Sequence, residues 1–306
     1  MRDVARPDDP AAAPPRIRLL GGEVDVMTSR QLLDFIAARI ASRRPALITN
    51  HNLHSLHLWR RTAGMAALYA RADRIEIDST PLVAWARLMG HEVSRAHRLT
   101  YLDWREAFWA RAAAEGWRVF HLGCAPGVGE KAATAVMERH PALKLRTHHG
   151  FFDMQGPQND AVLEAVRGHR PDILLVGMGM PRQELWIEAN RERLPPCVVM
   201  PIGGALAYEA GAVATPPRWT GRWGLEWLWR FATEPRRLFH RYFVEPWALA
   251  PQAAGLLAVS LGLSRLHSDD LRLLEAGMGV YDALYLWCRD AVDEAHNWPN
   301  AKGPRS

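Results

Sequence analysis

Residues 171–194 carry the clearest chemical signal in the sequence, a glycine-rich turn between an apolar run and a helical pattern. Gly177 and Gly179 form this turn, which would bring backbone N–H groups and the positive end of a helix close to a phosphate or diphosphate. Arg182, Gln183 and Glu184 crowd the first helical turn. The helix dipole favours an acid such as Glu184 there, but it gives no reason for the other two, so we expect ligand contacts.

A second polar group, Thr49-Asn50-His51-Asn52, follows the apolar run 46–48. Capping of the next helix accounts for one of these short polar side chains, but not for all four. We therefore expect this group to contain ligand contacts.

Asp78 follows the predicted strand 74–77 and precedes Ser79, Thr80 and Pro81. Thr80 is a good N-cap and Pro81 suits the first helical position, so the pattern is compatible with a simple helix start. Since Thr80 can cap the helix, the carboxylate of Asp78 is left over. A carboxylate at the carboxyl end of a strand is a candidate general base.

A second glycine-rich turn begins at Gly123 and is typical of nucleotide binding. Its spacing is not GxGxxG, so no dinucleotide is predicted. Arg98 and Asp103 form either an ion pair with each other or contacts with a substrate. No Asp-x-Asp occurs to hold a divalent metal on a diphosphate, and we predict neither a metal ion nor a cofactor.

Short apolar runs alternate with helical patterns from Ile17 onward. This alternation predicts an α/β fold, a mostly parallel Rossmann-like sheet with helices on both faces, which binds ligands at the carboxyl ends of its strands. Helices are predicted at 29–41, 52–70 and 128–139, among others. The predicted strands are 46–49, 74–77, 118–122, 143–147, 173–176 and 197–202.

The chain has 306 residues, of which 48% are apolar, so it can bury a sizeable core. Its net charge of +5 suggests an acidic partner, which could be a nucleotide, an anionic lipid or nucleic acid. Three widely spaced cysteines indicate a reducing compartment. Residues 1–16 have no signal-peptide pattern and predict a disordered lead-in to an α/β core at 17–214.

The composition changes near Thr215. Residues 218–247 contain six arginines, three glutamates and five tryptophans. An aromatic helix face beside an arginine face suits a membrane interface, although the tryptophans could instead pack on the core. We predict a membrane-proximal appendage at 215–249 and a helical extension of unknown role at 250–306.

Taken together, these segments resemble the WecG/TagA/CpsF family of bacterial glycosyltransferases, most closely its exopolysaccharide-assembly branch. Two segments are specific in order and spacing: GMGMPRQE at 177–184, and GLEW followed by EPRRL and RY at 224–242. The resemblance covers roughly residues 18–249.

The resemblance implies an inverting, metal-independent enzyme of cell-surface polysaccharide synthesis. Such enzymes transfer a sugar, often of the N-acetylmannosamine type, from a UDP-sugar to a polyprenyl-diphosphate-linked sugar. The implied location is cytoplasmic, peripheral on the inner face of the cytoplasmic membrane, and oligomers are possible.

The family pattern implies that Asp78 is the general base and that Thr49 and Gln183 contact substrate. It also implies that arginines of the appendage offset the charge of the leaving diphosphate. The chain departs from the pattern at Ser79, where glycine is common, and at Ala207, where aspartate is frequent. The complete predicted substrate-binding set is Thr49, Asn52, Arg98, Asp103, Gly123, Gly177, Gly179, Arg182, Gln183, Glu184, Arg230, Arg237 and Arg241.

Three other functions compete with this interpretation. An NAD-dependent oxidoreductase or epimerase would need GxGxxG near the N-terminus and an acidic residue about twenty positions later, and neither is present. The departures at Ser79 and Ala207 keep open a non-catalytic subunit that binds a lipid-linked sugar or scaffolds a polysaccharide complex. Nucleic-acid binding is disfavoured, because the arginines alternate with tryptophan and glutamate and no nucleic-acid module is recognisable.

Overall fold

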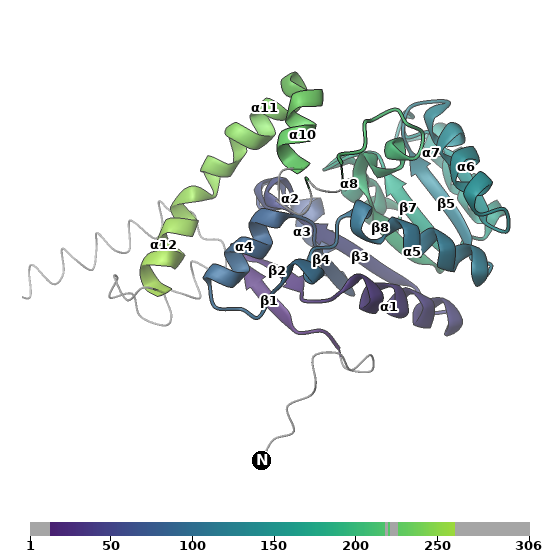
Figure 1. Cartoon of the computed structure of the whole chain (residues 1–306). Helices are drawn as coiled ribbons and strands as arrows, with labels where there is room; N and C mark the ends of the chain where they lie inside the picture. Colours follow the sequence, from purple (N-terminus) through teal and green to yellow (C-terminus); the bar gives the residue numbers. More distant parts are fainter. Residues whose placement is uncertain (1–12, 218–219, 221–225, 261–306) are drawn as a thin grey trace, which may run out of the picture.

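The computed structural model describes residues 13–217, 220 and 226–260, without the side chains at 237, 251–252 and 258–260. Six parallel strands form one sheet in the order β4-β3-β8-β7-β5-β6, which confirms the predicted α/β architecture (Figure 1). The strands are β3 (Ala46–His51), β4 (Arg74–Ile77), β5 (Arg118–Gly123), β6 (Lys144–His148), β7 (Ile173–Gly177) and β8 (Val198–Pro201).

The two strands β7 and β8 are buried on both sides, which explains why they are apolar runs. All five residues of β7 are buried, and β7 pairs with β5 on one side and β8 on the other. The six predicted strands are all present, with ends that differ by no more than two residues.

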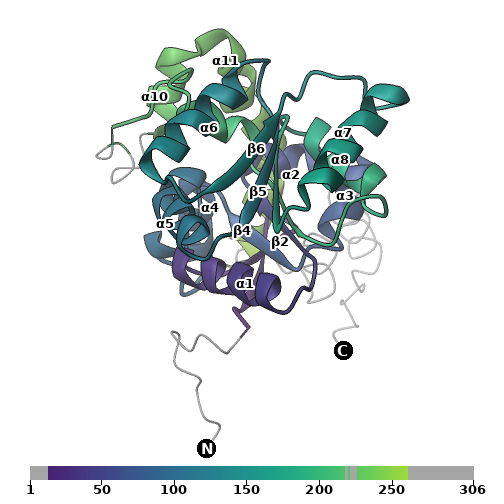
Figure 2. The same ribbon diagram turned by 90° about the vertical axis from the view of Figure 1, so that its right-hand side faces the viewer.

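Helices cover both faces of the sheet (Figure 2). The helices α1, α5 and α6 supply one large apolar cluster, and α7 and α8 pack on the opposite face. Two helices match their predicted limits, and α1 begins with a capping box between Thr28 and Gln31. The bounds are α1 (Ser29–Ala41), α4 (Thr80–Leu88), α5 (Tyr101–Ala114), α6 (Val128–Arg139), α7 (Pro157–His169) and α8 (Arg182–Asn190), with 3-10 turns η1 (Arg95–His97) and η2 (Gly203–Tyr208).

The prediction of one helix over 52–70 is wrong, because the chain forms two helices, α2 (Leu53–Trp59) and α3 (Ala63–Tyr69). The first helix ends in a tight turn, in which the N–H of Arg61 donates to the carbonyl of Leu58. Thr62 is extended, with φ −127° and ψ 98°, and starts the second helix in a new direction.

A two-stranded hairpin, β1 (Arg16–Leu19) and β2 (Gly22–Asp25), was not predicted. Its turn residues, Leu20 and Gly21, both have positive φ. Asp25 accepts a hydrogen bond from the N–H of Ile75 at 2.7 Å, so the hairpin satisfies a backbone donor on the edge strand β4. The first described strand thus begins at Arg16.

The appendage consists of α10 (Glu226–Thr233), α11 (Pro235–Phe243), η3 (Glu245–Ala248) and α12 (Ala250–Ser260). In Figure 1, α10 and α11 lie above α2, and α12 descends beside α4. The first 12 residues of the predicted lead-in and residues 261–306 of the predicted extension lie outside the described part of the chain. Within the described residues, no helix is both long and apolar enough to cross a membrane.

Candidate active site

Asp78 lies immediately after β4, at the point where the chain turns into α4. The N-cap of α4 is Ser79, whose hydroxyl accepts from the N–H of Leu82 at 3.4 Å. The prediction that Thr80 caps this helix is therefore wrong by one residue, because Thr80 already has helical geometry. The departure from glycine at Ser79 thus has a local structural role, and Asp78 is not needed as a cap.

Asn52 joins the end of β3 to Asp78. Its amide nitrogen donates to Asp78 Oδ2 at 3.0 Å, while its amide oxygen caps α2 by accepting from the N–H of Ser55 at 2.9 Å. The two halves of one side chain therefore orient the carboxylate and fix the start of α2.

The other three residues of this polar group point elsewhere. Asn50 donates to the carbonyl of Pro201 at 2.9 Å, and His51 contacts Ser55. Thr49 is fully buried, and its hydroxyl oxygen has no hydrogen-bond partner among the described residues. Of the four side chains, that of Asn52 is the one hydrogen-bonded to the Asp78 carboxylate, whereas substrate contact by Thr49 stays a prediction.

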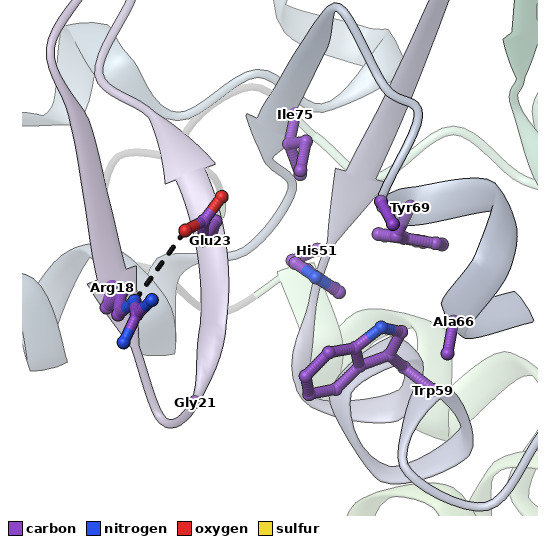
Figure 3. A pocket seen from close by; sticks show the side chains of 9 residues that line it. Arg18, Gly21, Glu23, His51, Trp59, Ala66, Tyr69 and Ile75 are labelled. Carbon is purple, nitrogen blue, oxygen red and sulfur yellow. Dashed lines mark ion pairs between the residues drawn. The ribbon is translucent and has the colours of Figure 1, made fainter. Parts of the chain in front are cut away.

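A separate pocket of about 260 Å³ lies between the β1–β2 hairpin and the α2–α3 pair (Figure 3). His51, Trp59 and Tyr69 line it, and Arg18 pairs with Glu23 at its rim. None of the predicted site residues lines this pocket. The side chains of His51 and Asn52 thus diverge, one toward the pocket and the other toward Asp78.

Arg98 is buried beside Asp78's strand, since its backbone bridges to Ile77 of β4. Its guanidinium binds Asp103 at 2.8 Å and both carboxylate oxygens of Glu226 at 2.6 and 3.2 Å. Of the two alternatives for Arg98 and Asp103, the structure shows the ion pair. The contact with Glu226, which the sequence pattern did not predict, ties the start of α10 to the core.

The surroundings of Asp78 act on its proton affinity in opposite directions. Burial raises the pKa of Asp78 to about 6, although the hydrogen bond from Asn52 and the positive charges of Arg241, Arg230 and Arg98 oppose this rise. A carboxyl group with this pKa is ionised at neutral pH and can still accept a proton readily, as a general base requires.

The appendage brings two of the three predicted arginines to this carboxylate. Arg230 is on α10 and Arg241 is on α11, and both act electrostatically on Asp78. The side chain of Arg237 lies outside the described residues. The helices that carry these arginines come from a segment more than 150 residues after Asp78 in the chain.

Gln183 lies beneath the glycine-rich turn and is fully buried. Its side-chain oxygen accepts from the N–H of Gly179 at 3.2 Å and of Gly203 at 3.0 Å, and its nitrogen donates to Glu184 at 2.8 Å. Gln183 therefore holds the ends of β7 and β8 together, a role that the sequence pattern did not reveal. Direct contact between Gln183 and substrate stays a prediction.

The neighbours of Gln183 also support the turn. Burial raises the pKa of Glu184 to about 7, and its second carboxylate oxygen has no partner among the described residues. Arg182 donates to the carbonyl of Phe152 at 2.5 Å and lies over its ring, so it fixes the loop between β6 and α7. Their contacts with a ligand stay predictions.

The predicted glycines serve two different needs. A Cβ atom at Gly123 would lie 2.4 Å from the carbonyl oxygen of Gly177, and one at Gly177 would lie 2.7 Å from that of Gly203. At these two positions glycine permits neighbouring backbones to pack closely at the carboxyl ends of the strands. Gly179 has open space around it but a φ of +81°, so it is required by backbone conformation. Binding of phosphate by this edge stays a prediction.

The described residues contain no group of three or more histidine, cysteine, aspartate or glutamate side chains placed to hold a metal ion. The groups around Asp78 are instead an amide, guanidinium ions and the buried carboxyl group of Glu76. The arrangement can accept a proton at one atom and stabilise negative charge close by.

Comparison with known proteins gives a family for most of the chain. The sequence model of the glycosyl transferase WecG/TagA/CpsF family matches residues 17–259, from β1 into α12. A second, shorter match, to the ChrB C-terminal domain, covers residues 238–288 and continues past the described part of the chain.

Curated relatives from Staphylococcus aureus carry the name N-acetylglucosaminyldiphosphoundecaprenol N-acetyl-beta-D-mannosaminyltransferase. The protein from strain MRSA252 is 26% identical over 233 residues, which cover 73% of this chain and 87% of the relative. The protein from strain NCTC 8325 / PS 47 is 25% identical over the same shares of the two chains.

Proposed function

The chain belongs to the WecG/TagA/CpsF family of glycosyl transferases, and on that premise we propose which sugar it transfers and how. The donor is a UDP-sugar of the N-acetylmannosamine type, and the acceptor is a sugar linked to polyprenyl diphosphate, in cell-surface polysaccharide synthesis. The names of the relatives support this choice of transferred sugar and acceptor. The observation that carries the mechanism is the carboxylate of Asp78, held by Asn52 and faced by arginines of the appendage.

In the proposed reaction, Asp78 accepts the proton of the acceptor hydroxyl as its oxygen attacks the anomeric carbon of the donor. The new carbon–oxygen bond forms while the bond to UDP breaks, and the electron pair of that bond leaves with the diphosphate. Attack opposite the leaving group inverts the anomeric carbon. The proton on Asp78 then passes to water, so one carboxylate suffices.

The leaving diphosphate gains negative charge in the transition state, and cations stabilise it there. Arg98 has two carboxylates on its guanidinium, so it offers little net positive charge to a ligand. Arg230 and Arg241 are therefore the cations that we assign to the leaving group. In this mechanism they do the work that a divalent metal does in other transferases.

We further propose that the appendage rests on the inner face of the cytoplasmic membrane, where a polyprenyl-linked acceptor is found. Its apolar side chains are widely exposed, up to 74% for Trp247, with Arg236 exposed nearby. Aromatic rings and arginines together suit the headgroup region. The exposed apolar residues of the appendage are Trp227, Leu228, Phe239, Phe243, Val244 and Trp247.

Vesicle co-sedimentation tests the membrane contact. The wild-type protein should sediment with vesicles of phosphatidylethanolamine and phosphatidylglycerol, and the double variant Phe239→Ser, Trp247→Ser should stay in solution. Phe151→Ser is a matched control, because Phe151 is 70% exposed but lies on the loop after β6. Equal sedimentation of the double variant and the wild type would refute the contact.

Release of UDP tests the reaction itself. The purified full chain would be given a panel of UDP-sugars and a short-chain polyprenyl-diphosphate sugar, with and without EDTA. We expect release that depends on the acceptor, is fastest with an N-acetylmannosamine donor and survives EDTA. Loss of turnover in EDTA, with recovery on adding Mg²⁺, would refute the role given to the arginines.

A further inference from the structure

Glu245 joins the appendage to the core through a buried carboxylate. It is only 8% exposed, although it lies in η3 near the surface helices of the appendage. The ring nitrogen Nδ1 of His54 donates to one carboxylate oxygen at 2.5 Å, and that of His240 donates to the other at 3.2 Å. Since His54 belongs to α2 and His240 to α11, Glu245 bonds to both sides of the contact.

The cost of burying a carboxylate indicates that this contact is specific. Such burial is unfavourable unless the charge is hydrogen-bonded, whereas an apolar residue would have packed against α2 without that cost. Burial raises the pKa of Glu245, but the hydrogen bond from His54 and the histidines nearby outweigh it and bring the pKa below its usual value. The carboxylate is thus ionised, and both oxygens are satisfied.

The bond to His54 lies close in sequence to Asn52, the hydrogen-bond partner of the candidate general base. His54 is two residues after Asn52, which caps α2 and donates to Asp78. On the other side, Glu245 is four residues after Arg241, whose charge acts on Asp78. Glu245 therefore ties the helix of an active-site arginine to the helix whose cap holds the carboxylate.

We propose that Glu245 is a positioning residue: through His54 it holds α11 against α2, and so keeps Arg241 and Arg230 beside Asp78. This inference rests on the proposed function, in which Asp78 is the base. A second tie between Arg98 and Glu226 secures the start of α10, but it involves a residue of the candidate site itself. Glu245 holds the appendage without standing next to the reacting atoms.

The test compares the full-length wild type with Glu245→Ala, Glu245→Gln, His54→Ala and the double variant Glu245→Ala, His54→Ala. Glu192→Ala is the control, because the Glu192 side chain is 80% exposed and forms an ion pair with the adjacent surface residue Arg191. Hydrogen exchange over residues 235–243 reports the docking of α11 without any turnover. We expect at least tenfold faster exchange in Glu245→Ala and His54→Ala, an intermediate rate in Glu245→Gln, and the wild-type rate in the control.

The pH profile of kcat/KM separates positioning from general destabilisation. When α11 is undocked, Arg241 and Arg230 no longer lower the pKa of Asp78, while Asn52, Arg98 and Glu76 remain around it. The acid limb should therefore shift, and kcat/KM at pH 7 should fall at least tenfold in Glu245→Ala, because the leaving diphosphate loses its two cations. Because the two residues act through one bond, the double variant should lose no more activity than the worse single variant.

The histidines and Arg241 that face Glu245 must be considered in reading this profile. Burial lowers the pKa of His54, and His57, His240 and Arg241 are the other charged or titratable groups near the carboxylate. Their titration affects α11 docking, so exchange of residues 235–243 is measured at each pH beside the activity.

Wild-type exchange rates in both Glu245→Ala and His54→Ala, or an acid limb that does not move while kcat/KM falls, would overturn the proposal. If Glu245→Ala does not fold, Glu245→Gln and His54→Ala carry the same comparison. Absence of turnover in the wild type would count against the proposed function, whereas faster exchange in the variants would still support the tie between α11 and α2.

Discussion

The hydrogen bond from Asn52 to Asp78 should set the pH at which the enzyme becomes active. A general base works only when ionised, so kcat/KM is expected to fall as the pH drops through the pKa of Asp78, which lies at about 6. The amide of Asn52 stabilises the ionised form at an N–O distance of 3.0 Å. Removing this donor should raise the pKa of Asp78 and move the acid limb of the profile to higher pH.

The expected size of the shift follows from the strength of such a bond. A hydrogen bond to a charged group contributes about 1.5–3 kcal/mol, which corresponds to roughly 1–2 pKa units. In Asn52→Ala the acid limb should therefore lie near pH 7 to 8. At pH 7 this corresponds to a fall in kcat/KM of roughly two- to tenfold, and near pH 9 to almost none.

Asn52 also caps α2, so a second variant is needed to separate ionisation from stability. Asn52→Asp keeps an oxygen that can accept from the N–H of Ser55, but it places a second carboxylate beside Asp78. Its acid limb should move at least as far as in Asn52→Ala. Its Tm should fall at neutral pH, where the two carboxylates repel each other, and recover toward about pH 5 as Asp78 is protonated. Asn52→Ala loses the cap, about 1 kcal/mol, and its Tm should fall by about 2–4 °C.

This comparison of the variants is made by stopped-time assays of UDP release from about pH 5 to 9. Thermal unfolding of each variant is measured beside them. An acid limb that stays at the wild-type position in both variants would refute the role of Asn52. A fall by the same factor at every pH would also refute it, because that pattern indicates lost folding or binding rather than altered ionisation of Asp78.

Two further predictions concern stability. Gly177→Ala should unfold or lose at least about 2 kcal/mol of unfolding free energy, because its Cβ would lie 2.7 Å from the carbonyl oxygen of Gly203. Gly168→Ala in α7 has open space around its Cβ and should be as stable as the wild type. Equal urea midpoints for the two variants would contradict this prediction. Arg98→Met should lose about 3 kcal/mol in urea unfolding, because it leaves Asp103 and Glu226 without their shared cation, and Arg98→Lys should lose less. An Arg98→Met variant with wild-type stability would show that these pairs do not hold α10.

The strands β7 and β8 were predictable because they are buried on both faces and so leave a simple apolar signature. β4 was placed at its observed limits, and α1 and α6 followed from helical spacing and their flanking residues. The hairpin β1–β2 was missed because its strands are short and its turn uses Leu20 at positive φ, which gives no glycine-type signal at that position. The break between α2 and α3 was missed because residues 60–62 contain neither glycine nor proline.

The candidate base was predictable from its position, because Asp78 ends a strand and is not needed to cap the helix that follows. The shift of that cap from Thr80 to Ser79 does not change this conclusion, since either residue relieves Asp78 of the role. The partner of Asp78 was predicted only as one of several polar residues, because strand alternation and the turn into α2 decide which side chain points to it.

The contacts between distant segments left no signal in the sequence. His54 and Glu245 are 191 positions apart, and Arg98 and Glu226 are 128 apart, so neither pairing follows from local spacing. Gln183 was predicted to contact substrate because it stands in a glycine-rich turn. Its side-chain oxygen is instead hydrogen-bonded to the backbone N–H of Gly203. This contact forms only when the sheet is packed and brings Gly203 close to Gln183.

Asp78→Asn is the variant that tests the central claim most directly. Asparagine has nearly the same shape but cannot accept the proton, so binding of the UDP-sugar should remain while the transfer step is lost. With the full chain and the best donor and acceptor, we expect acceptor-dependent UDP release to fall at least about 10²-fold, with the donor Kd within about threefold of the wild-type value. Turnover by Asp78→Asn near the wild-type rate would contradict the assignment of Asp78 as the general base.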